Sequence, residues 1–153
     1  MTSIEAMSAQ PAFFLDTNIL IYATSLSPDH AAKAPAARAW VQRRDWGVST
    51  QVLMEFFANA RRPKHRLQPT AAEEFVQRIA ARRPVQAMDR ELVLDALSLR
   101  HRYYLSHWDA AILCAARRLG AGTVVSEDME TGRDYEGVTV LNPFAIGTTP
   151  GDI

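Results

Sequence analysis

The chain has 153 residues, of which 48% are hydrophobic and 22% charged, and its 17 acidic and 17 basic side chains leave no net charge. This composition fits one soluble globular domain and argues against a protein that coats nucleic acid non-specifically, since such proteins are basic overall. No apolar run approaches the roughly 20 residues of a membrane span, and the N-terminus is not typical of a signal peptide. A single cysteine, Cys114, excludes an internal disulfide, fits a cytoplasmic location and is expected to be buried rather than catalytic.

Hydrophobic periodicity and turn signals predict strands that alternate with helices along the chain. A buried strand over 12–15 is followed by a short helix over 17–22 and by a loop over 23–34, where Ser27-Pro28-Asp29 is typical of a turn. Further strands are expected at 46–49, 85–88, 123–126 and 138–141. Further helices are expected at 35–44, from a cap at Ser49 or Thr50 to about Arg61, from a capping box at Thr70 and Glu73 to about Arg82, from Asp89 to about Tyr103, and from Ser106 to Gly120.

This alternation indicates an α/β fold whose parallel sheet is covered on both faces. In such sheets, ligands bind outside the carboxyl ends of the strands. Asp16 and Asp128 each follow a predicted strand closely, so the architecture places both at that edge.

Four acidic residues stand beside strongly apolar runs rather than in charged surface stretches: Asp16, Glu55, Asp109 and Asp128. If folding brought them together, each pair of carboxylates would cost about 3 kcal/mol at an effective dielectric of about 20. Several such pairs would rival the roughly 5–15 kcal/mol stability of a whole domain. We therefore expect a cation to hold them.

Each acid also has an alternative interpretation. Asp16 could simply cap the helix that follows it, and Asp109 could belong to a capping box that begins at Ser106. Glu55 lies at the border of an apolar helix face and could reach solvent. Asp128 could belong to a turn, in which case the adjacent Glu127 is a reserve candidate for the same role.

Several segments resemble the ordered acidic motifs of PIN domains, above all of the VapC-type toxins of prokaryotic toxin–antitoxin pairs. The segments are 15–20 (LDTNIL), 49–56 (STQVLMEF), 108–112 (WDAAI), 126–129 (SEDM) and the closing 140–144 (VLNPF). The resemblance covers about residues 13–144. It implies one PIN-like domain over 1–153, with a core at about 12–144, loose termini at 1–11 and 145–153, and a three-layer α/β/α sandwich around a central parallel sheet.

The resemblance further implies an endoribonuclease that depends on Mg²⁺ or Mn²⁺ and hydrolyses RNA phosphodiester bonds with a metal-activated water. Asp16, Glu55, Asp109 and Asp128 would be the catalytic acids. Asn18, Ser126 and Glu127 would support them. The implied partners are RNA, an antitoxin protein and a second copy of the chain, with no membrane.

Hard oxygen ligands without a histidine or cysteine cluster suit Mg²⁺ or Mn²⁺ better than zinc. We expect Asp16 and Asp109 to hold the principal metal, with Asp128 and Glu55 completing the site directly or through water. A non-catalytic metal-binding module that acts through protein or RNA binding is the alternative.

Basic residues after the Glu55 helix could follow an RNA backbone: Arg61, Arg62, Lys64 and Arg66. Their alternative is a solvated turn or part of an antitoxin surface. Trp108 could stack on a base, but its place beside an apolar stripe favours core packing. Met54 and Phe57 could contribute to a protein interface.

Overall fold

The computed structural model describes residues 10–145. The loose termini expected at 1–11 and 145–153 lie almost entirely outside this range, although Pro11 is buried, so the core extends slightly further than predicted. The strands are β1 (Phe13–Leu15), β2 (Trp46–Ser49), β3 (Val85–Gln86), β4 (Thr123–Val125), β5 (Asp134–Tyr135) and β6 (Val138–Leu141). The helices are α2 (Thr17–Thr24), α3 (Ala34–Gln42), α4 (Thr50–Ala60), α5 (Pro69–Arg82), α6 (Arg90–Tyr103) and α7 (His107–Leu119), with 3₁₀ turns η1 (Pro28–His30) and η2 (Pro63–His65).

The six strands form one sheet in the order β3-β2-β1-β4-β6-β5. All neighbours are parallel except β5 and β6, which form an antiparallel hairpin. The expected central parallel sheet is therefore present, and the short β5 extends it at one edge in the antiparallel direction. Glu136 and Gly137 connect this hairpin with φ angles of 55° and 96°, as the twist of a two-residue hairpin turn requires.

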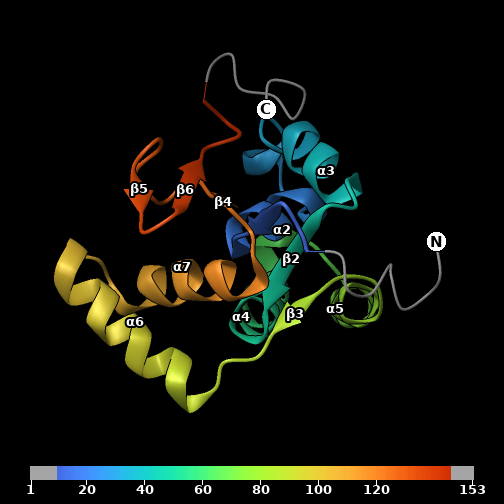
Figure 1. Cartoon of the computed structure of the whole chain (residues 1–153). Helices are drawn as coiled ribbons and strands as arrows, with labels where there is room; N and C mark the ends of the chain where they lie inside the picture. The colour runs from blue at the N-terminus through green and yellow to red at the C-terminus, as the bar shows by residue number, and fades with distance from the viewer. Residues whose placement is uncertain (1–9, 146–153) are drawn as a thin grey trace, which may run out of the picture.

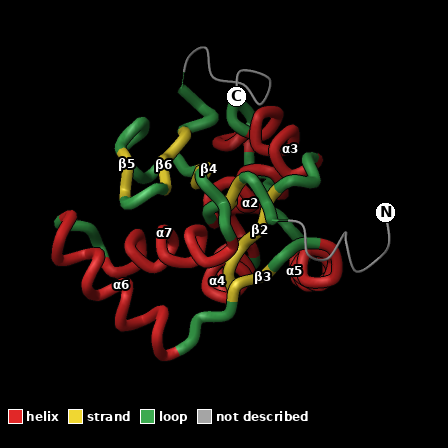
Figure 2. Tube along the Cα trace, in the orientation of Figure 1, coloured by secondary structure: helices red, strands yellow, loops and turns green. Residues whose placement is uncertain are grey.

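The helices cover both faces of the sheet, which confirms the three-layer α/β/α sandwich (Figures 1 and 2). Helix α7 contacts β2, β3, β4 and β6, so it lies across one face, with α6 packed against it. Right-handed crossovers place α2 to α5 on the other face, because the chain moves from β1 outward to β3 and then returns past β1 to β4. The order in which the chain adds strands therefore reverses between β1 and β4. Ligands of α/β sheets bind at such a switch point.

Most of the predicted helix boundaries are confirmed by their caps. Ser49, Asp89 and Ser106 each accept a backbone hydrogen bond from the first turn of their helix, and Gly120 ends α7 with a φ of 78°. The capping box at Thr70 is wrong: α5 begins earlier, at Pro69, and its N-cap residue makes no side-chain hydrogen bond. Proline at the first helical position supplies the required φ and removes one of the N–H groups that the start of a helix leaves unpaired.

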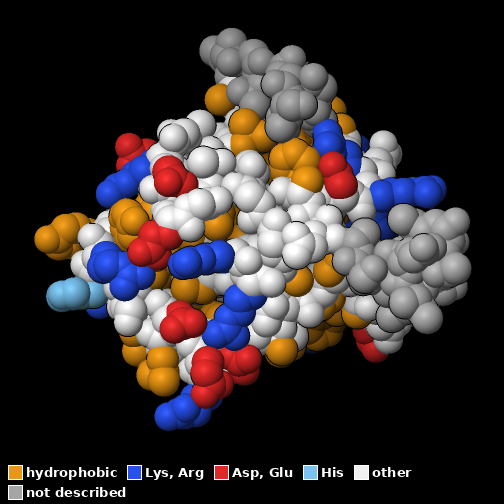
Figure 3. All heavy atoms as spheres, viewed as in Figure 1, with side chains coloured by type: hydrophobic (Ala, Val, Ile, Leu, Met, Phe, Trp, Pro, Cys, Tyr) orange, Lys and Arg blue, Asp and Glu red, His pale blue; other side chains and the backbone are white. Residues whose placement is uncertain are grey.

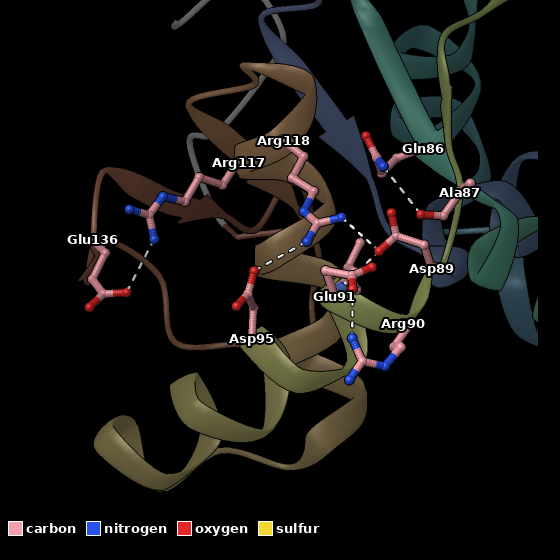
Figure 4. A network of polar contacts seen from close by, with 10 residues as sticks. Gln86, Ala87, Asp89, Arg90, Glu91, Asp95, Arg117, Arg118 and Glu136 are labelled. Atoms are coloured by element: carbon pink, nitrogen blue, oxygen red, sulfur yellow. Dashed lines mark hydrogen bonds and ion pairs between the residues drawn. The ribbon is translucent and has the colours of Figure 1, made fainter.

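Ion pairs connect α7 to α6 and to the β5–β6 hairpin (Figure 4). Arg118 contacts Asp89 at 2.8 Å and Asp95 at 3.1 Å, and Arg117 contacts Glu136 at 3.3 Å. Figure 3 shows acidic and basic side chains interleaved on this side of the molecule. These paired arginines are engaged by carboxylates within the fold, and exposed pairs of this kind stabilise by only about 0–1 kcal/mol.

No helix among residues 10–145 is both long enough and apolar enough to cross a membrane.

Candidate functional site

A cleft of about 460 Å³ lies at the carboxyl ends of β1 and β4, and all four predicted acids line it. Asp16 follows β1, Asp128 follows β4, Glu55 comes from the second turn of α4, and Asp109 comes from the first turn of α7. The cleft thus collects side chains that are up to 112 positions apart in the chain, between Asp16 and Asp128.

Asp16 is the most buried of the four acids, with 7% of its surface exposed. Its Oδ1 accepts a hydrogen bond of 2.7 Å from the backbone N–H of Thr17, which confirms its capping role. Its Oδ2 accepts one of 2.7 Å from the Ser126 hydroxyl. Burial, together with the nearby charges of Asp128 and Asp109, raises the pKa of Asp16 to about 6 in spite of these two bonds. Capping and a functional role are therefore compatible in one side chain.

Asn18 and Ser126 connect the first acid to the last. Asn18 Nδ2 donates to Asp128 Oδ2 at 2.9 Å and to Ser126 Oγ at 3.3 Å. Ser126 Oγ also accepts from the backbone N–H of Asp128 at 3.1 Å. Two of the three supporting residues predicted from the sequence, Asn18 and Ser126, thus contact Asp128, and Ser126 also contacts Asp16.

Glu55 is held by two side chains that the sequence analysis did not single out. Thr17 Oγ1 donates to its Oε2 at 3.0 Å, and Gln51 Nε2 donates to its Oε1 at 2.9 Å. Gln51 stands one helical turn before Glu55, a spacing that places both side chains on one face of α4 and that could have revealed the pair. Because a carboxylate only accepts hydrogen bonds, this contact also fixes which end of the Gln51 amide faces Glu55.

Asp109 is half-buried near the start of α7, where its backbone N–H donates to the Ser106 hydroxyl at 3.1 Å. Burial raises its pKa, and the charges of Asp128 and Glu55 add to that rise. Asp109 therefore feels the field of two other acids in the cleft, which a surface cap would not.

Glu127, the reserve candidate, is occupied elsewhere. Its Oε2 lies 2.6 Å from Lys33 Nζ, and its Oε1 accepts the Tyr22 hydroxyl hydrogen. Asp128, in contrast, lines the cleft. The geometry therefore favours Asp128 over Glu127 as the fourth acid.

A hard divalent cation fits the oxygen donors of the cleft, among which are carboxylate oxygens and the side-chain amide oxygens of Asn18 and Gln51. Asn18 Oδ1 and Gln51 Oε1 are buried and have no hydrogen-bond partner among residues 10–145. Within the same range, no three acidic, histidine or cysteine side chains lie close enough together to form a preformed metal site. Mg²⁺ retains several of its waters and takes one or two carboxylates directly, so widely spaced acids suit it better than they suit zinc.

The predicted basic residues divide into two pairs. Arg62 and Lys64 line the cleft, whereas Arg61 and Arg66 do not. The Arg61 guanidinium instead packs over the Phe57 ring at 4.5 Å. All four side chains are exposed.

The lining of the cleft also includes two histidines that the sequence analysis did not connect. His30 and His65 come from η1 and η2, and their rings stack with centroids 5.2 Å apart. Both line the cleft.

Two apolar expectations near the cleft have opposite outcomes. Trp108 is 56% exposed and lines the cleft, so the expected core packing is wrong. It belongs to the first turn of α7, where the centroid of its ring lies 4.4 Å from that of His107. Met54 is 70% exposed, as its proposed interface role requires. Cys114 is buried, as expected.

The sequence matches the PIN domain family over residues 13–133. This match spans most of the chain, so the protein belongs to the PIN domain family. No curated protein sequence matches the chain.

Solved structures share the fold at low sequence identity. A toxin–antitoxin complex from Klebsiella pneumoniae has a TM-score of 0.61 and 18% identity, over 85% of this chain and 96% of that chain. VapC20 from Mycobacterium tuberculosis, a sarcin–ricin loop cleaving toxin, has a TM-score of 0.58 and 20% identity, over 73% of this chain and 86% of that chain. VapBC2 from Rickettsia felis, bound to a promoter DNA fragment, has a TM-score of 0.58 and 16% identity, over 85% and 97%.

Proposed function

We propose that the protein is a Mg²⁺- or Mn²⁺-dependent endoribonuclease and the toxin component of a VapBC-type toxin–antitoxin pair. One observation carries this proposal: four acids from four separate segments line a single cleft at the switch point of the sheet. Membership of the PIN domain family and the likeness to the sarcin–ricin loop cleaving toxin VapC20 support it.

Asp16 and Asp109 are the residues that would hold the ion, since both are ionisable groups whose pKa is raised by burial and by neighbouring carboxylates. A divalent cation relieves that repulsion and thereby restores the charged form of both acids. A bound Mg²⁺ or Mn²⁺ supplies a water of lowered pKa and neutralises charge on the attacked phosphate.

The remaining residues of the cleft would orient this chemistry. Asn18 holds Asp128, while Thr17 and Gln51 hold both oxygens of Glu55. A carboxylate fixed at both oxygens keeps one direction toward a phosphate or a coordinated water. Such support is what a hydrolytic site needs, because misplaced groups lose much of their effect on rate.

The proposed partners are an antitoxin protein and a second copy of the chain, with action in the cytoplasm. The likeness to toxin–antitoxin complexes from Klebsiella pneumoniae and Rickettsia felis supports the antitoxin. The exposed Met54 and Trp108 offer apolar contact area, and Trp108 also lines the cleft.

A non-catalytic metal-binding module that acts through protein or RNA binding is the second candidate, and the basic Arg62 and Lys64 that line the same cleft suit such binding. Cleavage of end-labelled RNA separates the two functions. Purified protein should cut RNA with Mg²⁺ or Mn²⁺ and not with EDTA, and Asp16→Asn or Asp109→Asn should abolish the cutting with the fold intact.

Glu130→Gln is the matched control, because Glu130 is an exposed acid that pairs with Arg133 and does not line the cleft. It should cut RNA at the wild-type rate. Equal cutting by the Asp16→Asn and wild-type proteins would refute the assignment and point to a contaminating nuclease.

A further inference from the structure

The cleft has a second, basic half. Arg62, Lys64 and His65 come from the segment that follows α4, and His30 comes from the loop between α2 and α3. These four side chains line the same cleft as the four acids. Opposite charges thus share one cavity.

His65 forms a fixed wall of this half. Only 5% of its surface is exposed, and its ring stacks on His30 at an angle of 28°. The Ser25 hydroxyl lies 2.8 Å from His30 Nδ1 and 3.5 Å from His65 Nδ1. The backbone carbonyl of His65 accepts from the N–H of Leu26 at 2.8 Å. These contacts hold the short segment that carries Arg62 and Lys64 against the loop after α2.

Arg62 and Lys64 have no ion-pair partner within residues 10–145, in contrast to Arg117 and Arg118. Their charges lower the pKa of His65, after the larger effect of its burial and alongside that of His30. The basic half therefore carries positive charge that no carboxylate of the described fold neutralises.

We propose that Arg62 and Lys64 form a phosphate-binding subsite, which holds a backbone phosphate of the RNA next to the one that is cut, with His65 as a positioning residue. This inference rests on the proposed function. The planar guanidinium binds phosphate oxygens in pairs, and the ammonium adds a point charge. A polyanion suits a cleft that is lined by both acidic and basic residues. One phosphate can bind a cation held by the acids while the neighbouring phosphate contacts the basic residues.

The segment itself supplies a matched control. Arg62→Gln/Lys64→Gln and Arg61→Gln/Arg66→Gln each remove two exposed positive charges within six consecutive positions, but only the first pair lines the cleft. Binding of a short fluorescent single-stranded RNA is measured by anisotropy in EDTA, with Asp16→Asn in every protein so that no cleavage occurs. Arg62→Gln/Lys64→Gln should weaken binding by about tenfold or more, as expected for loss of phosphate contacts.

The salt dependence tests for phosphate contact itself. The slope of log K against log salt should fall by about 1.4 in Arg62→Gln/Lys64→Gln, which is two contacts at about 0.7 each on a single strand. The slope of Arg61→Gln/Arg66→Gln should stay close to that of the parent. Equal losses in the two variants would overturn the subsite and leave a general effect of net charge.

Cleavage kinetics separate this inference from the proposed function. In the presence of metal and an intact Asp16, Arg62→Gln/Lys64→Gln should raise KM and change kcat little. If the wild-type protein cuts RNA and this variant has the same KM as the wild type, the subsite is refuted and the nuclease is retained. A wild-type protein that never cuts, but whose RNA binding depends on this pair alone, refutes the nuclease and keeps the subsite. Loss of antitoxin binding with RNA affinity unchanged would assign the surface to the antitoxin and also refute the subsite.

Discussion

The Ser126 hydroxyl donates a hydrogen bond of 2.7 Å to Asp16 Oδ2 and so connects the carboxyl ends of β4 and β1. Both residues are buried, and this bond opposes the rise in pKa that burial imposes on Asp16. The bond favours the charged carboxylate, which is the form that can bind a cation.

Replacing Ser126 by alanine should therefore raise the pKa of Asp16 above its value of about 6. A hydrogen bond to a charged group contributes about 1.5–3 kcal/mol, equivalent to roughly one to two pH units. The acid limb of the pH–rate profile for RNA cleavage should shift upward by a comparable amount, with activity recovering at alkaline pH. An unmoved acid limb would show that the bond does not control Asp16.

Asp16 also predicts how the stability of the metal-free protein depends on pH. Its folded-state pKa of about 6 exceeds the ordinary 3.8, so between these values the folded state binds more protons than the unfolded state. Stability is therefore fully present below about pH 4 and falls as the pH rises to about 6, by up to about 3 kcal/mol from this group.

Asp16→Asn should remove that loss and melt at a higher temperature than the wild type at pH 7 in EDTA. Asparagine can still accept the Thr17 N–H through its amide oxygen, so the start of α2 is retained. Thermal melts of both proteins from pH 4 to pH 8 provide the measurement. Parallel curves across this range would mean that Asp16 is not protonated near pH 6.

The sequence places Asp16 and Asp128 in the site because both follow apolar strands, whereas Glu55 and Asp109 lie on helices and were connected to them by the resemblance to PIN motifs. Phe13, Phe14 and Leu15 are buried by the helices on both faces of the sheet, and Asp16 must then lie at the sheet edge. The contact between Gln51 and Glu55 could also have been predicted, because the two residues are four positions apart on one helix.

Other features of the fold and the site depend on tertiary contacts, which a local sequence pattern does not predict. Strand β5 has two residues, too few for an alternating pattern, and its pairing with β6 depends on the turn at Glu136 and Gly137. His30 and His65 are 35 positions apart on two short 3₁₀ turns, so only tertiary packing brings their rings together. Trp108 shares the helical spacing of buried Ile112 but stands at the rim of the cleft.

Divalent cations should stabilise the protein through the four acids. Saturation at about one hundred times the dissociation constant adds about 2.7 kcal/mol, which is roughly 5–10 °C in melting temperature for a domain of this size. Asp109→Asn and Asp128→Asn should lose most of this shift with Mg²⁺ and Mn²⁺.

Glu127→Gln gives the informative comparison, since Glu127 is adjacent to Asp128 but pairs with Lys33. It should retain the full metal-induced shift, while its metal-free stability changes by only about 0–1 kcal/mol, as for other partly exposed ion pairs. A shift lost in Glu127→Gln and kept in Asp128→Asn would reverse the assignment of the fourth acid.

Replacing Gln51 should slow RNA cleavage without lowering the stability of the fold. It is 9% exposed, donates to Glu55 at 2.9 Å, and leaves its own Oε1 without a partner among residues 10–145. Gln51→Leu keeps most of the volume and removes both the donor and the unpaired oxygen, so the melting temperature should change little. Cleavage should slow by about 10- to 100-fold in kcat, as when other residues that orient metal-site carboxylates are removed.

Met54→Leu on the same helix is the control, because Met54 is 70% exposed. It should leave kcat unchanged. If Gln51→Leu also cleaves at the wild-type rate, then Thr17, which donates to the other oxygen of Glu55, is sufficient to orient that carboxylate. Combining Gln51→Leu with Thr17→Val should then produce the loss that neither substitution causes alone, because Glu55 would have lost both of its side-chain donors.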